Sequence, residues 1–188
     1  YMTAALLTLA EQKTLDLSKL SMAIIGCGHV GREVLQRAKA LGLHCIVNDP
    51  PLARATAEPL YRPIEEVFDC DIVSLHVPLT REGPDATHAM VNESFLARMK
   101  PGAIFINAAR GGVMDEPAVR AAVDRKHLGA CILDVWANEP AINPETINRC
   151  NIATAHIAGH SFDGKVEGTR MLYEAYCKYA DKMPQWDP

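Results

Sequence analysis

Short apolar runs alternate with segments of helical periodicity along most of this chain. The runs are apolar at consecutive positions, not at every second one, which is typical of strands covered on both faces. A sheet with both faces covered is usually parallel, so the pattern predicts parallel strands at 22–25, 44–48, 71–75, 103–107, 129–135 and 151–155.

Helical patterns fill the intervals between these runs. Residues 31–41 carry one apolar stripe, residues 92–100 begin at an asparagine cap, and residues 115–126 open with Asp115 and an early proline. Further amphipathic helices are expected at 3–12 and 168–183. Alternation of strand and helix predicts the α/β class, with a doubly wound, Rossmann-like parallel sheet.

A glycine-rich turn follows the first run, in the stretch MAIIGCGHVGREVL. Gly26 permits a tight turn, Gly28 lets a pyrophosphate approach the backbone, and Gly31 allows the next helix to pack closely. A glycine turn without a ligand is the alternative, but the strand before it and the helix after it favour a dinucleotide site.

Asp49 ends the second run, 21 residues beyond Gly28, where a carboxylate accepts hydrogen bonds from ribose hydroxyls. A carboxylate there repels a 2′-phosphate, and the residues that follow are Pro50 and Pro51. NAD is therefore favoured over NADP as the cofactor, although Arg54 leaves NADP open.

Four ionisable residues follow the later runs and share one sheet edge in the predicted fold. Arg110 is suited to a substrate carboxylate, Asp134 to a nicotinamide carboxamide, and Glu139 to pairing with an imidazole. His156 comes out of the last strand, and histidine is a residue type that commonly serves as a general acid or base. Taken alone, each residue also has a structural interpretation. Arg110 could be a solvated surface arginine, Asp134 and Glu139 could be caps or surface acids, and His156 could be a structural histidine.

Composition excludes several other functions. The net charge is −4, from 19 basic and 23 acidic residues without a basic run, so no nucleic-acid partner is expected. No apolar stretch approaches the roughly 20 residues of a membrane span, and no leader pattern opens the chain, so the sequence predicts a cytoplasmic protein. The six cysteines stand singly and suit buried thiols, and the histidines lack metal-ligand spacing.

Several motifs together resemble the NAD-binding domain of the D-isomer-specific 2-hydroxyacid dehydrogenases. They are GCGHVG at 26–31, HVPL at 76–79, KPG at 100–102, INAARG at 106–111, LDVW at 133–136, EP at 139–140 and HIAG at 156–159. The resemblance implies that Arg110 binds substrate, that Glu139 is the carboxylate partner, and that His156 is the general acid/base. It also implies a homodimer and cofactor contacts at His29, Val30, His76, Val77, Pro78, Ala108, Arg110 and Asp134.

Within the family, the segments at 48–51, 78–90 and 156–169 are similar to a branch that oxidises a phosphorylated 2-hydroxy acid. Phosphoglycerate and glyoxylate/hydroxypyruvate types remain alternatives, as does a non-catalytic NAD(H)-binding sensor or interaction module. Family members insert the NAD-binding domain into a substrate domain, so residues 1–188 are interpreted as the NAD-binding domain alone. Residues 1–20 and 165–188 would then connect to a missing substrate domain, and we expect NAD(H) binding with little turnover.

Overall fold

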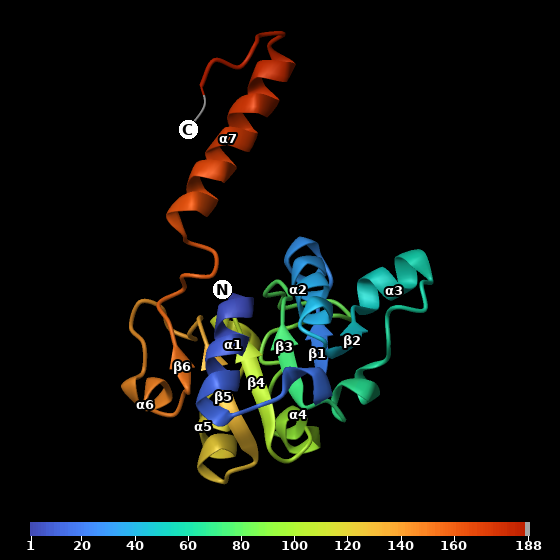
Figure 1. Cartoon of the computed structure of the whole chain (residues 1–188), viewed down its shortest axis with the longest axis vertical. Coiled ribbons are helices and arrows are strands. Elements are labelled where there is room, and N and C mark those ends of the chain that lie inside the picture. Colours follow the sequence, from blue (N-terminus) through green and yellow to red (C-terminus); the bar gives the residue numbers. More distant parts are fainter. Residues whose placement is uncertain (187–188) are drawn as a thin grey trace. The chain divides into compact units, whose positions relative to one another are not determined.

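The computed structural model describes residues 1–186 and divides the chain into two compact units, Tyr1–Ala155 and a second unit that begins at His156. The first unit contains a six-stranded sheet in which every pair of neighbours is parallel, in the order β2-β1-β3-β4-β5-β6 (Figure 1). The strands are β1 (Ser21–Ile25), β2 (His44–Asn48), β3 (Ile72–Leu75), β4 (Ala103–Asn107), β5 (Leu128–Leu133) and β6 (Ile152–Ala153). The parallel doubly wound sheet is therefore confirmed.

Both faces of this sheet are buried, as the continuous apolar runs predicted. On β1, Met22 and Ile24 belong to one buried cluster, while Ala23 and Ile25 belong to the other. The first cluster includes residues of α1 (Met2–Lys13) and α2 (His29–Ala40), and the second includes residues of α4 (Glu93–Arg98) and α5 (Glu116–Asp124). Successive side chains of a strand point to opposite faces, so each central strand needs apolar residues throughout.

Helix starts follow the capping residues of the sequence. Asn92 accepts a hydrogen bond from the Phe95 amide at 3.0 Å, and Asp115 caps α5. Two short helices were not predicted: α3 (Pro50–Thr56), capped by Asp49, and α6 (Pro144–Ile147), capped by Asn143. The first unit also contains short 3₁₀ segments, η1 (Leu17–Lys19), η2 (Ile64–Val67) and η3 (Gly111–Val113).

The second unit contains α7 (Phe162–Tyr179), which starts before the position that the sequence indicated. Ser161 caps its first turn by accepting a hydrogen bond from the Gly164 amide at 3.1 Å. Across residues 1–186, none of the helices combines the length and the apolarity that a bilayer crossing requires.

Helix α1 offers a matched test of its packing. Leu9 is 1% exposed and Leu7 is 49% exposed, on the same helix. Leu9→Ala should lower the free energy of unfolding by about 2–4 kcal/mol, because it leaves a cavity in the core. Leu7→Ala should change it by less than about 1 kcal/mol. Urea denaturation followed by circular dichroism measures both, and equal effects would contradict the packing of α1 described here.

Candidate functional site

The strand order creates a switch point between β1 and β3. The chain leaves β1 for β2 on one side and then returns to pair β3 with the other side of β1. Open α/β sheets bind ligands outside the carboxyl ends of the strands at such a point. Gly26 and His76 directly follow these two strands, so the glycine turn lies at this position.

At Gly26 and Gly31, the glycine turn makes close backbone contacts that leave no room for a side chain. Gly26 has φ +90°, and a Cβ built on it would lie 2.6 Å from the carbonyl oxygen of His76. A Cβ on Gly31 would lie 2.0 Å from the carbonyl oxygen of Gly26. A Cβ on Gly28 would meet no atom of the described residues within 4 Å, so this glycine faces open space. That is the space a pyrophosphate needs in order to approach the backbone.

The N-terminus of α2 opens into the same space. Its N-cap is Gly28, and in the part of the chain that the structure describes no side chain caps the first turn. The predicted cofactor residues His29 and Val30 lie in that turn and are exposed, Val30 by 63%. The first amides of a helix favour an anion, so this arrangement fits a pyrophosphate.

Asp49 connects the glycine turn to α3. Its Oδ2 accepts a hydrogen bond from the Cys27 amide at 2.7 Å, and its Oδ1 accepts one from the Leu52 amide at 2.9 Å. The carboxylate is therefore fixed beside the turn, and its contact with ribose hydroxyls stays a prediction. Cys27 itself is fully buried, and burial raises the pKa of its thiol, which agrees with a packing role.

A cavity of about 630 Å³ lies between these elements. Its walls come from the glycine turn, the start of α3, the end of β3 and the following loop at 80–90. Six predicted cofactor residues line it: Gly26, Gly28, Asp49, His76, Val77 and Pro78. The structure thus gathers residues that are up to 52 positions apart, from 26 to 78, around one space.

His76 contributes a neutral ring to this cavity. Its Nε2 lies 2.9 Å from the Ser74 hydroxyl, and burial lowers its pKa from 6.5 to about 4. His76 therefore presents an uncharged imidazole to the cavity at neutral pH, and its contact with a cofactor stays a prediction.

The loop after β4 presents the predicted substrate residue Arg110. Asn107 is fully buried and fixes this loop by accepting from the Ala109 amide at 3.0 Å and donating to the Arg110 carbonyl at 3.1 Å. Arg110 is exposed, and Ala108 before it is partly buried. A Cβ on Gly111 would lie 1.9 Å from the Trp136 carbonyl oxygen, so the loops after β4 and β5 are in direct backbone contact.

The loop after β5 carries Asp134 and Glu139. Asp134 is fully buried and accepts a hydrogen bond from the Thr154 hydroxyl at 2.5 Å. Glu139 is exposed, and its Oε1 accepts a hydrogen bond from the Trp136 amide at 2.9 Å. In the first unit, Arg110 and Glu139 thus lie on neighbouring loops that the Gly111 contact joins.

His156 begins the second unit and is described with that unit. Its backbone is left-handed, with φ 56°, and its ring stacks edge-on against the His160 ring with centroids 4.9 Å apart. The structure therefore places six of the predicted cofactor residues around one cavity, and it places Arg110 and Glu139 on neighbouring loops. The assembly of Arg110 and Glu139 with His156 stays a prediction.

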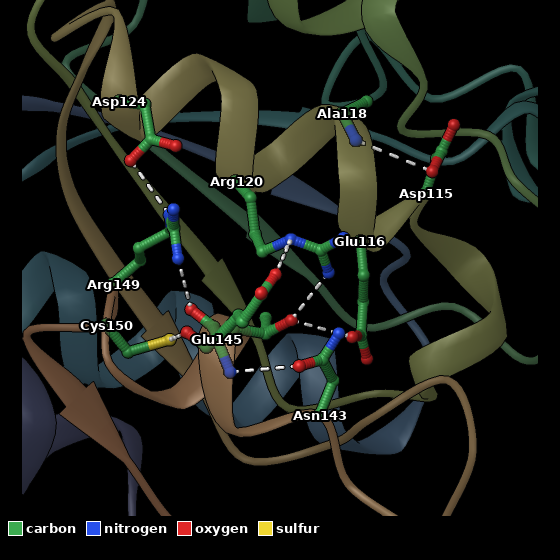
Figure 2. Close-up of polar contacts among 10 residues, drawn as sticks. Asp115, Glu116, Ala118, Arg120, Asp124, Asn143, Glu145, Arg149 and Cys150 are labelled. Atoms are coloured by element: carbon green, nitrogen blue, oxygen red, sulfur yellow. Dashed lines mark hydrogen bonds and ion pairs between the residues drawn. The ribbon is translucent and has the colours of Figure 1, made fainter.

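The support of the Glu139 loop was not predicted from the sequence. Glu116 of α5 is buried and accepts hydrogen bonds from the Ala137 amide at 2.6 Å and from the Thr146 hydroxyl at 2.9 Å. Arg120 donates to the same hydroxyl at 2.9 Å (Figure 2). These contacts attach both sides of the loop to α5. In sequence, Glu116 is only an acid in a first helical turn, so its distant partners could not be inferred.

Metal and disulfide chemistry receive no support from the described residues. No group of three His, Cys, Asp or Glu side chains among residues 1–186 could hold a metal ion. The six cysteines are free, and Cys27, Cys70, Cys131 and Cys177 are buried.

Comparison with known proteins agrees with this geometry. Residues 7–158 match the model of the D-isomer specific 2-hydroxyacid dehydrogenase, NAD binding domain. An erythronate-4-phosphate dehydrogenase of Salinibacter ruber is 44% identical, over 99% of this chain and 49% of that protein. One of Hydrogenovibrio crunogenus is 42% identical, over 95% and 47%. The chain thus spans about half the length of the curated relatives it matches.

The chain also resembles solved structures of dehydrogenases. The D-lactate dehydrogenase of Aquifex aeolicus, solved with NAD and lactic acid, superposes with a TM-score of 0.71 at 26% identity. The superposition covers 94% of this chain and 62% of that chain.

The low pKa of His76 predicts a pH dependence of stability. Between pH 6.5 and 4 the unfolded chain binds a proton at His76 that the folded chain does not, so the free energy of unfolding falls as pH falls. His76→Gln should remove about 1–3 kcal/mol of this fall. Urea titrations at several pH values measure it, with the exposed His44→Gln as control. Identical pH profiles for wild type and His76→Gln would contradict the buried neutral ring.

Proposed function

The chain belongs to the D-isomer-specific 2-hydroxyacid dehydrogenases, as an NAD-binding domain, and on this basis we propose that it serves an NAD-dependent oxidation of a D-2-hydroxy acid. The observation that carries the proposal is the fixed Asp49 carboxylate beside the open Gly28 face, at the switch point of a parallel sheet. The residues present there fit the cofactor: amides for the pyrophosphate, a carboxylate for ribose hydroxyls, and apolar prolines beside the adenosine space.

Bound NAD supplies a hydride acceptor, and the chain's own residues supply the rest. Arg110 is exposed and permanently charged, so it is suited to hold a substrate carboxylate and to stabilise charge that develops on the keto oxygen. His156 takes the proton from the substrate hydroxyl and returns it in the reverse direction. Glu139 pairs with that imidazole and favours its protonated form.

The substrate proposed is 4-phosphoerythronate, in the synthesis of pyridoxal phosphate. Support comes from the branch-specific segments at 48–51, 78–90 and 156–169, and from the names of the relatives at 42–44% identity. A homodimer is proposed with it, from the family resemblance, and a location in the cytoplasm is proposed as well. We further propose that residues 1–20 and 165–188 connect to a substrate domain.

Binding is the first test. Calorimetric titration of the chain with NADH should show one site per chain. Gly28→Ala should weaken NADH binding by about tenfold or more, because its Cβ enters the pyrophosphate space while meeting no protein atom. Its melting temperature should stay close to that of wild type. A Gly28→Ala variant that binds NADH as tightly as wild type would contradict the assignment of this space.

Turnover is the second test. This test uses a form of the protein that oxidises 4-phosphoerythronate. In that form, His156→Asn should lower kcat about 100-fold to 10,000-fold, because a positioned general acid/base is lost. NADH affinity should change little. His44→Asn, at the start of β2, is the control. Full activity of His156→Asn would exclude this histidine as the general base, and robust turnover by the 188-residue chain alone would contradict its interpretation as an NAD-binding domain without a substrate domain.

A further inference from the structure

We propose that the loop at 80–87 selects NAD over NADP, with Glu82 and Asp85 as selecting residues beside Asp49. This inference rests on the proposed function, because it requires that the cavity beside Gly28 binds a nicotinamide dinucleotide. It adds to the role of Asp49 two acidic residues from a segment that the dinucleotide motif does not include.

The first support is the charge of the cavity. Three carboxylates line it, from Asp49, Glu82 and Asp85, and its described lining contains neither lysine nor arginine. His76 also lines the cavity, and its lowered pKa leaves it uncharged at neutral pH. NADP differs from NAD by a 2′-phosphate with a charge of about −2 at neutral pH, so each carboxylate repels it.

The second support is that the loop is held in a defined conformation. The Thr80 amide donates to Thr87 Oγ1 at 2.8 Å, and the Thr87 amide donates to Thr80 Oγ1 at 3.1 Å. The Thr87 hydroxyl also donates to the Pro78 carbonyl at 2.5 Å. This threonine pair closes the loop at its base, so Glu82 and Asp85 are carried by a fixed segment.

The third support is the partner of Arg54. Arg54 is the basic residue of α3, the helix that starts at Asp49, and an arginine near this position can accommodate a 2′-phosphate. Here its guanidinium forms a two-point ion pair with Asp85, in which Nη1 donates to Oδ1 at 3.1 Å. Asp85 therefore acts in two ways. It adds negative charge to the cavity, and it forms an ion pair with Arg54, the cation that a 2′-phosphate of NADP would need.

The test compares ligands that differ only by the 2′-phosphate. Calorimetry gives the Kd of NADH and NADPH, and that of 5′-AMP and 2′,5′-ADP, for the wild-type chain and for Asp85→Asn. Asp85→Asn should lower the ratio of the NADPH Kd to the NADH Kd by about tenfold, since it removes a nearby charge and frees Arg54. Glu82→Gln should lower the ratio less, because no arginine is released.

Two further variants separate the local effect from net charge. Asp124→Asn removes the same charge and breaks a comparable surface ion pair, that with Arg149 at 2.8 Å, away from the cavity. It should leave the ratio unchanged. Asp85→Asn alone should raise the affinity for NADPH. The double variant with Arg54→Ala should lose a large part of that increase. The wild-type ratio should also fall at high salt, because exposed charges are screened.

The outcomes distinguish this inference from the proposed function. If neither NADH nor 5′-AMP binds the wild-type chain, the proposed function fails. If NADH binds, but Asp85→Asn changes the ratio by less than about twofold or no more than Asp124→Asn does, the selecting role of the loop is wrong.

Discussion

Close contact between backbone segments, with no side chain between them, is the constraint on which the site depends. It occurs where Gly26 meets the His76 carbonyl, where Gly31 meets the Gly26 carbonyl, and where Gly111 meets the Trp136 carbonyl. The first two contacts join β1, α2 and the end of β3, and the third joins the loops that carry Arg110 and Glu139. Any Cβ at these positions would push apart the segments that form the site.

The fold could be predicted where the local pattern of apolar and polar residues decides the structure of a segment. Continuous apolar runs marked all six strands, because both faces of this sheet are buried. The helices α3 and α6 were missed, since each is a short segment that opens with proline and lacks an apolar stripe long enough to recognise. Ser161 and Asp163 were the signals for the early start of α7, as an N-cap and a first-turn acid.

The site was predictable where a motif has a fixed spacing. Gly26, Gly28 and Asp49 gather around one cavity because the glycine turn follows β1 and Asp49 follows β2, and these two parallel strands are neighbours in the sheet. By contrast, the buried acceptor Glu116 and the Asp85 partner of Arg54 depend on contacts across 30 and 31 positions of sequence. Such contacts follow from the tertiary fold, so local periodicity gives no sign of them.

Whether the turn at 26–31 and Asp49 hold NAD together is tested most directly by a crystal structure of the chain with NADH. We expect the ribose hydroxyls within hydrogen-bond distance of the Asp49 carboxylate and the pyrophosphate over Gly28, at the first amides of α2. A cofactor bound away from Asp49, with the space beside Gly28 occupied only by water, would contradict the site described here.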